Sequence, residues 1–335
     1  MLNERRRRVL SALVEEYIRS AHPVGSRALV ERYRLGCSPA TVRNELSILE
    51  ETGYLYQPHV SAGRVPTDSG YRSFVDDLLA EESILGAAEA PRREGLLHRA
   101  EVDELMREAS SLLTRLTNCM AVVLAPELSL SRIRRIDLLS MAPRRAVFVL
   151  ITETGQVVNR TLELPEDASP ERLAEVERAL NAAFTDKRSA DIRPIRDAMT
   201  GDPEGDALVT RVVDEILDSL AEADHDRFYH GGIPALLAQP EFADAGHVLP
   251  LMQAVEDGIG MLEALSDFLA ENRVSVRIGS ENRRADLDNV SIVATHYGVL
   301  AADGVVGVIG PTRMDYPKAI TAVRAVADGL NEALS

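Results

Sequence analysis

The sequence predicts a multidomain α+β protein, in which an N-terminal helical unit precedes a body of antiparallel sheet and helices. Its 335 residues are too many for one small core and are typical of two or three domains. Hydrophobic residues make up 45% of the chain and charged residues 27%, which is the composition of a folded protein. Helical periodicity fills the first 80 residues, whereas strand-like runs begin near residue 120.

Charge is divided unevenly along the chain. The net charge is −16, yet residues 1–74 hold eleven Arg and eight acidic residues, and the remainder carries −19. A basic N-terminal segment on an acidic body is consistent with a DNA-binding head whose body does not bind DNA nonspecifically. A chance excess of three positive charges is equally consistent with these counts, so the motifs have to decide.

Three helices are predicted within the first 53 residues. Apolar residues recur at helical spacing between positions 10 and 18. Ser26 is expected to N-cap a short second helix. Ser38 followed by Pro39 predicts the start of a third helix, which Gly53 ends.

The third helix has the polar face of a DNA-reading helix. Two short helices, a tight turn and a capped helix predict a helix-turn-helix, whose second helix enters the major groove. Arg can bridge two acceptors of guanine, and Asn can pair with adenine through two hydrogen bonds. The residues expected to be exposed on this helix are Thr41, Arg43, Asn44 and Ser47.

After the third helix the pattern changes period. Residues 54–57 and 64–66 are strand-like and flank a loop, and Thr67 is expected to cap a fourth helix. Three helices, a hairpin and a helix predict a winged helix-turn-helix over residues 1–80, in which the hairpin reaches a phosphate or the minor groove. The alternative is a helical packing module with a polar solvent face. The seven expected DNA-binding residues are Ser38, Thr41, Arg43, Asn44, Ser47, His59 and Arg64.

The rest of the chain divides by composition. Residues 81–103 are expected to form a linker, and residues 104–165 and 241–335 carry helices and strands of an antiparallel-sheet domain. Residues 166–240 hold 17 acidic and 8 basic residues, and their short helical patterns are broken by Pro and Gly. This change of composition between strand-rich segments predicts an inserted domain.

The sequence offers no enzyme, metal or cofactor motif. Its only lysines, Lys187 and Lys318, follow no phosphate-binding loop, and no G-x-S-x-G nucleophile turn occurs. The histidines lack metal-ligand spacing, and Cys37 and Cys119 cannot form a disulfide framework. No apolar run is long enough to span a membrane and no secretion signal is recognisable, so a soluble cytoplasmic protein with no membrane partner is expected.

Three segments together resemble a known family. Residues 23–26 and 38–72, the latter reading SPATVRNELSILEETGYLYQPHVSAGRVPTDSGYR, strongly resemble the N-terminal domain of the heat-inducible transcription repressor family HrcA. Residues 307–317, GVIGPTRMDYP, are similar to the family's C-terminal signature, and residues 278–282, IGSEN, to a third family segment. The resemblance therefore covers nearly the whole chain.

The resemblance implies a specific architecture and function. The sheet domain would be GAF-like, and residues 166–240 would form an inserted dimerisation domain. The homodimer would repress chaperone operons such as groE and dnaK by binding the inverted repeat called CIRCE in double-stranded DNA. The GroE chaperonin would keep the repressor active, and heat would relieve repression. The alternative is a winged-helix regulator controlled by a small ligand in the GAF-like domain; a catalytic function ranks last.

Overall fold

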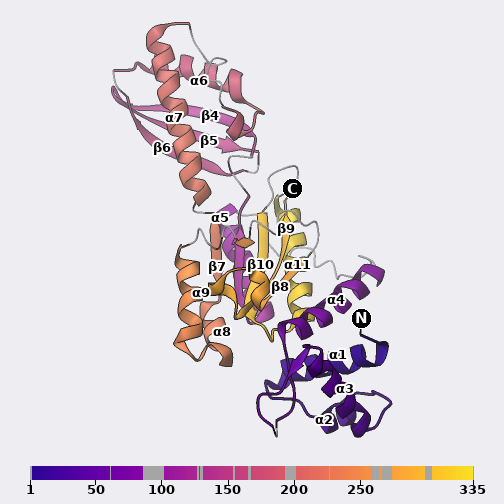
Figure 1. Ribbon diagram of the computed structural model, residues 1–335. Coiled ribbons are helices and arrows are strands. Elements are labelled where there is room, and N and C mark those ends of the chain that lie inside the picture. Colours follow the sequence, from indigo (N-terminus) through magenta and orange to yellow (C-terminus); the bar gives the residue numbers. More distant parts are fainter. Residues whose placement is uncertain are drawn as a thin grey trace.

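The chain forms an elongated molecule of three parts (Figure 1). A helical N-terminal unit lies at one end, a five-stranded sheet with helices lies in the middle, and a three-stranded sheet with two helices lies at the other end. Most of the predicted linker, residues 81–103, lies outside the described residues. The computed structural model describes residues 2–60, 62–85, 102–126, 128, 131–153, 155–164, 167–192, 201–225, 227–257, 261, 264–265, 274–298 and 304–334.

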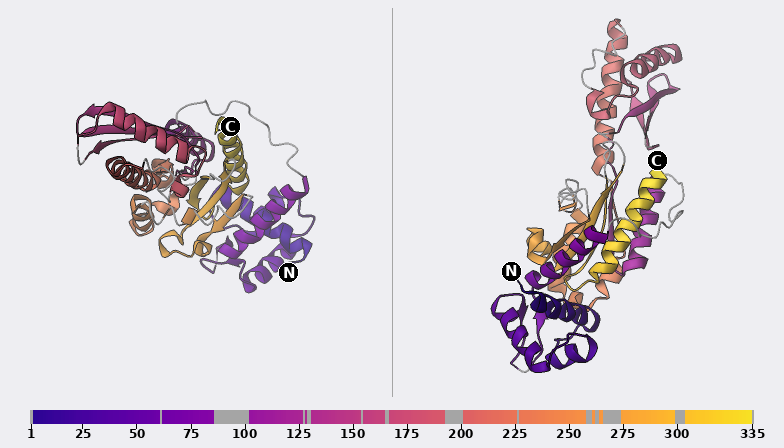
Figure 2. Two further views of the ribbon diagram at one scale, coloured as in Figure 1. Left: turned by 90° about the horizontal axis from the view of Figure 1, so that it is seen from above. Right: turned by 90° about the vertical axis from the view of Figure 1, so that its right-hand side faces the viewer.

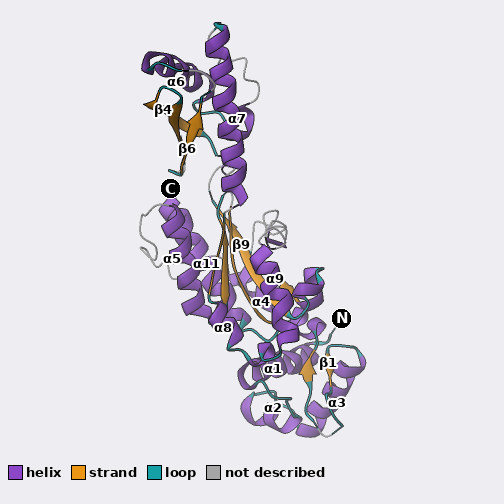
Figure 3. Cartoon of the chain, turned by 90° about the vertical axis from the view of Figure 1, so that its left-hand side faces the viewer, coloured by secondary structure: helices purple, strands orange, loops and turns teal. Residues whose placement is uncertain are grey.

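The N-terminal unit contains three helices, a two-stranded antiparallel hairpin and a fourth helix (Figure 3). The apolar stripe predicted for the first helix is confirmed, because Leu10, Leu13 and Val14 are fully buried. Thr67 caps the fourth helix as expected, accepting a hydrogen bond of 3.2 Å from the Gly70 N–H. The elements are α1 (Glu4–Ser20), α2 (Ser26–Arg32), α3 (Pro39–Glu51), β1 (Leu55–Tyr56), β2 (Val65–Pro66) and α4 (Asp68–Leu85).

The helix ends of this unit follow the predicted signals with one exception. Ser38 caps α3 through its side chain, and Gly53 follows the helix with a φ of +81°, the left-handed conformation that glycine adopts without strain. The prediction that Ser26 caps α2 is wrong. Gly25 occupies the N-cap position with extended backbone, so Ser26 is the first helical residue and is buried.

The middle part is an antiparallel sheet of strand order β7-β3-β10-β9-β8. Helices α5 and α11 pack against one face, and α8 and α9 pack against the other (Figure 1). The core on the α5 and α11 side is continuous with that of the N-terminal unit, since one cluster of buried residues includes Leu13, Val75 and Val323. The elements are α5 (Val102–Thr117), β3 (Met120–Leu124), β7 (Phe228–Gly231), α8 (Ile233–Leu237), α9 (Ala245–Asp257), β8 (Ser275–Ile278), β9 (Val290–Tyr297), β10 (Gly304–Pro311) and α11 (Tyr316–Leu334).

The far end is a separate three-stranded sheet, and it lies outside the predicted boundaries of the insertion, residues 166–240. The predicted strands are present, but among the strands that the structure describes β4, β5 and β6 pair only with one another, and they bury one face against α6 and α7 (Figure 2). Conversely, β7 lies inside the predicted insertion of residues 166–240 yet pairs with β3. The central sheet is therefore interrupted between Leu124 and Phe228. The elements are β4 (Ile133–Ala142), β5 (Arg145–Thr152), β6 (Val157–Glu163), α6 (Pro170–Phe184) and α7 (Pro203–His225).

Candidate nucleic-acid interface

Helix α3 presents a polar face on which two of the predicted residues are exposed. Val42, Leu46 and Leu49 are buried against the rest of the N-terminal unit. This orientation leaves Arg43 and Asn44 exposed to solvent. In the described part of the chain neither side chain makes an ion pair or a hydrogen bond, so both are available to a partner.

Ser38, Thr41 and Ser47 are already engaged in the local structure of α3. The Thr41 N–H donates to Ser38 Oγ at 3.2 Å, and the two hydroxyl oxygens lie 3.0 Å apart. Ser47 Oγ donates to the Arg43 carbonyl at 3.2 Å. The expectation that Thr41 and Ser47 are exposed is wrong, because both are half-buried beside the helix backbone. One of the Ser38 and Thr41 hydroxyls keeps its O–H free to donate to a phosphate, whereas the Ser47 O–H is already used and only its lone pairs remain.

The hairpin is shaped by Gln57, which sequence analysis missed. Its side-chain amide donates to the carbonyls of Val60 at 2.9 Å and Ala62 at 2.8 Å, and so closes the loop between the strands. His59 and Val60 are exposed in this loop, and Val60 is 98% exposed. The available signal was an amide side chain between a strand and a Pro-containing loop, which is the place where loop carbonyls need donors.

Arg64 ties the hairpin to two other elements. Its guanidinium Nε lies 2.8 Å from Glu50 Oε2 on α3, and only 18% of its side chain is exposed. Its backbone exchanges two hydrogen bonds of 2.9 Å with Val24, in the loop between α1 and α2. The structure therefore places Arg64 beside the end of α3, with its Nε next to a carboxylate.

Gly63 permits this close approach, so we expect Gly63→Ala to loosen the hairpin. A Cβ at position 63 would lie 2.5 Å from three backbone atoms of Val24, which cannot move independently of the chain. We expect a loss of about 1–3 kcal/mol in the free energy of unfolding, typical of overpacking. Urea titration followed by circular dichroism measures it. The matched control is Gly246→Ala, whose Cβ would approach only the Asp244 carboxylate at ordinary distance. Equal stability of the two variants would contradict this role for Gly63.

Comparison with known proteins identifies the family. The family described as HrcA protein C terminal domain matches residues 103–320. A heat-inducible transcription repressor HrcA of Beutenbergia cavernae is 42% identical over 355 aligned residues, which cover 100% of this chain and 99% of the relative. The chain belongs to the HrcA family. A repressor of the same name from Streptomyces avermitilis is 39% identical, covering 100% of this chain and 99% of the relative.

A solved structure has a similar fold over the whole length. A crystal structure of a hypothetical protein superimposes with a TM-score of 0.69 and 25% sequence identity, covering 100% of this chain and 99% of that one. The mixed α/β architecture with antiparallel sheets is thus shared beyond this chain. Among the helices that the structure describes, none is long and apolar enough to cross a membrane.

Most arginines of this HrcA family member's N-terminal segment are paired with carboxylates. Of the eleven Arg in residues 1–74, seven form ion pairs, including pairs of Arg6 with the buried Glu45 and of Arg32 with the buried Glu16. These pairs join α1 to α3 and to α2. The positive charge predicted from composition is therefore largely neutralised by carboxylates within the molecule. The arginines of this segment without an ion pair among the described residues are Arg8, Arg27, Arg34 and Arg43.

The two cysteines differ in environment, and we expect them to differ in reactivity. Cys119 is 5% exposed, and burial raises the pKa of its thiol to about 11, so almost none is thiolate at neutral pH. Cys37 is half-buried in the turn before α3. Iodoacetamide at pH 7.5 should modify one thiol in the folded protein and two in denaturant, as measured by mass spectrometry. Cys37→Ser should abolish the fast reaction, and equal labelling of Cys119 in the folded protein would contradict the prediction.

Proposed function

We propose that this protein is a dimeric heat-shock transcription repressor, in which the N-terminal unit is a winged helix-turn-helix and α3 reads the operator. The observation that carries the proposal is the exposed, unpaired Arg43 and Asn44 on a capped helix beside a hairpin. In this motif the second helix lies in the major groove with its N-terminal residues on base edges. The full-length relatives carry the name of heat-inducible transcription repressors, which supports the same function.

The open face of the β4–β6 sheet is our proposed dimerisation surface. One face of this sheet packs against α6 and α7, whereas Val147 and Val149 on the other face are only half-buried. Leu139 pairs directly opposite Val147 and is 54% exposed, and Met141 and Val157 are 68% and 55% exposed. Exposed apolar residues gathered on one sheet face are typical of an interface between subunits.

A two-fold dimer presents two α3 helices, so we propose an inverted-repeat operator of the CIRCE type upstream of groE and dnaK. Fluorescence anisotropy with a labelled inverted repeat and a scrambled duplex of equal length, at about 0.15 M salt, tests this. Nanomolar binding to the repeat alone, with two chains per duplex, supports the proposal. Equal weak binding to both duplexes, with and without the chaperonin, would overturn it.

Dependence on the GroE chaperonin is part of the same proposal. The central sheet pairs β3 with β7 and with β10, so its strands join residues that are far apart in the sequence, such as Val123 with Tyr229 and with Val306. Sheets of this kind fold slowly and expose apolar surface while they do so. The DNA-binding fraction recovered after heating should therefore rise when chaperonin and ATP are added. A recovery that is indifferent to chaperonin would remove this part of the proposal.

Control by a small ligand in the five-stranded, GAF-like part stays a prediction. A ligand that bound one dimer geometry better than another would shift the affinity for DNA. A thermal-shift screen of metabolites tests it, because a ligand that binds the folded state raises the unfolding temperature.

A further inference from the structure

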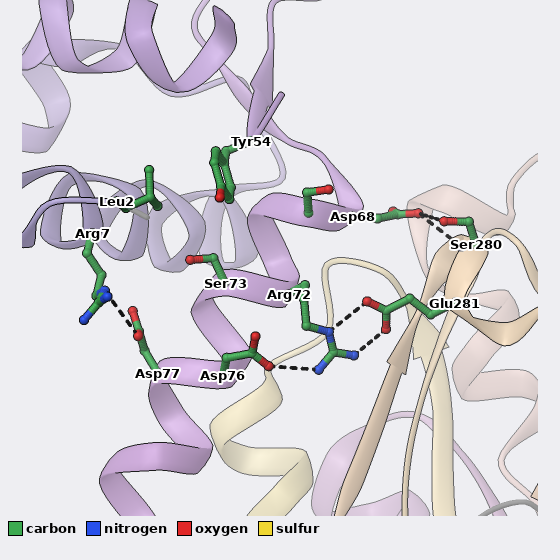
Figure 4. A pocket seen from close by; sticks show the side chains of 11 residues that line it. Leu2, Arg7, Tyr54, Asp68, Arg72, Ser73, Asp76, Asp77, Ser280 and Glu281 are labelled. Carbon is green, nitrogen blue, oxygen red and sulfur yellow. Dashed lines mark hydrogen bonds and ion pairs between the residues drawn. The ribbon is translucent and has the colours of Figure 1, made fainter. Parts of the chain in front are cut away.

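Two segments that are remote from the N-terminal unit in the sequence dock directly onto it. These are residues 278–282 and 307–317, which resemble family segments but for which the sequence alone suggested no function. In the structure, Asp68 at the start of α4 accepts hydrogen bonds from the Ser280 N–H at 3.1 Å and the Ser280 hydroxyl at 3.0 Å (Figure 4). The first of the two segments is therefore a contact surface for α4.

Arg72, one turn along α4, is held by the same segment. Its Nε donates to Glu281 Oε1 at 2.8 Å, and a second guanidinium nitrogen donates to Glu281 Oε2 (Figure 4). The second nitrogen also donates to the Val276 carbonyl at 2.5 Å. Glu281 also accepts a hydrogen bond of 2.9 Å from the Ile278 N–H, which fixes the carboxylate. An arginine held by both oxygens of an oriented carboxylate fixes direction as well as distance.

Gly279 makes room for this contact. It has a φ of +52°, and a Cβ there would lie 2.3 Å from Asp68 Oδ2. Any other residue would both strain the backbone and push α4 away. We call Asp68, Arg72, Gly279, Ser280 and Glu281 the head–body joint.

The second segment supports the N-terminal unit from another side. Arg313, 14% exposed, donates to the Ile18 carbonyl near the end of α1 at 3.2 Å and forms an ion pair with Glu241. The rings of Tyr71 on α4 and Tyr316 on α11 lie 6.0 Å apart, within a core that is continuous between the two parts. Polar contacts at two places and a shared core hold the N-terminal unit against the body, and the first of these contacts fixes the direction of α4.

We propose that the head–body joint sets the distance between the two recognition helices of the dimer, and thereby the operator spacing that the protein accepts. This inference rests on the proposed function. A head on a flexible tether would bind half-sites over a range of spacings, because the tether would adapt. A head fixed on its body accepts the one spacing that matches the dimer. Arg72, Gly279 and Glu281 are positioning residues, and none lies on α3 or on the hairpin.

The test is anisotropy with inverted repeats of graded spacing, together with a single half-site. Moving the half-sites of the wild-type repeat by about five base pairs, half a helical turn, should lower the affinity by about 100-fold. In Arg72→Met and in Gly279→Ala, moving the half-sites by the same five base pairs should lower the affinity by less than about fivefold. The affinity of both variants for a single half-site should equal that of the wild type. Glu222→Gln, which removes an exposed ion pair with Arg160 in the three-stranded part, is the control and should keep the wild-type pattern.

A measurement without DNA separates this inference from the proposed function. Spin labels at Glu51→Cys on α3 and Leu249→Cys on α9, in a Cys37→Ser background, should give a narrow distance distribution that broadens in both joint variants. An unchanged distribution together with unchanged spacing dependence would overturn the inference and leave the repressor function intact. If the wild-type protein binds no inverted repeat but shows a narrow distance distribution, the proposed repressor function is overturned. The fixed orientation of the N-terminal unit on the body would then still stand.

Discussion

Replacing Leu139 with Asp is expected to convert the proposed dimer into a monomer and to weaken binding of the inverted repeat by about 100-fold or more. Leu139 is 54% exposed and lies opposite Val147 of the central strand on the open β4–β6 face. A carboxylate there would lose its hydration in the dimer without gaining a partner, which is costly. Two linked heads gain about 10²–10⁴ in affinity over one, so a monomer loses that factor.

Sedimentation velocity and anisotropy on the same preparation measure both effects. The matched control is Leu249→Asp, the same change at a leucine that is 60% exposed on α9 and outside the proposed surface. It should leave both mass and affinity unchanged. If Leu139→Asp remains a dimer of wild-type affinity, the open face of the three-stranded sheet is not the interface.

Local rules explain why most of the N-terminal unit could be predicted from its sequence. Ser38, Pro39 and Gly53 mark the ends of α3 through interactions within a few residues of each position. The Ser26 prediction failed because Ser and Gly are both good N-cap residues and the two stand next to each other. Only the backbone conformation of Gly25 decides between them.

The boundary of the insertion could not be predicted in the same way, because strand pairing is not local. A run such as β5 has the same alternating pattern whichever sheet it joins. Composition changes only at the acidic helices that follow them, so the predicted boundary fell after β6. The short β7 lies among those helices, and nothing in its sequence indicated that it pairs with β3.

The same limit applies to the candidate site. The exposure of Arg43 and Asn44 follows from helical spacing and was predictable. The ion pair of Arg64 with Glu50 was not, since it depends on where the hairpin folds back against α3. Counting charges along residues 1–74 overstated the free positive charge for the same reason, because Glu16 and Glu45 neutralise arginines of neighbouring helices.

Arg43→Ala and Asn44→Ala are each expected to lower operator affinity by about 1–3 kcal/mol, which corresponds to roughly 5- to 150-fold. Both side chains are exposed on α3 and have no partner in the described part of the chain, so truncation should cost the free protein little stability. A lost base contact should also relax specificity at one position of the operator, whereas a lost phosphate contact should weaken all sequences alike and reduce the salt slope by about one. Anisotropy against single-base operator variants at several salt concentrations distinguishes the two.

The control for Arg43→Ala is Arg107→Ala, the same truncation of an exposed arginine on α5 of the body. It should leave operator affinity and specificity unchanged. If Arg43→Ala and Asn44→Ala both bind the operator as the wild type does, α3 is not the recognition helix. The remaining unpaired arginines, among them Arg27 on α2, would then be the first candidates for the DNA-binding surface, because an exposed cation without an internal partner is what a phosphate backbone requires.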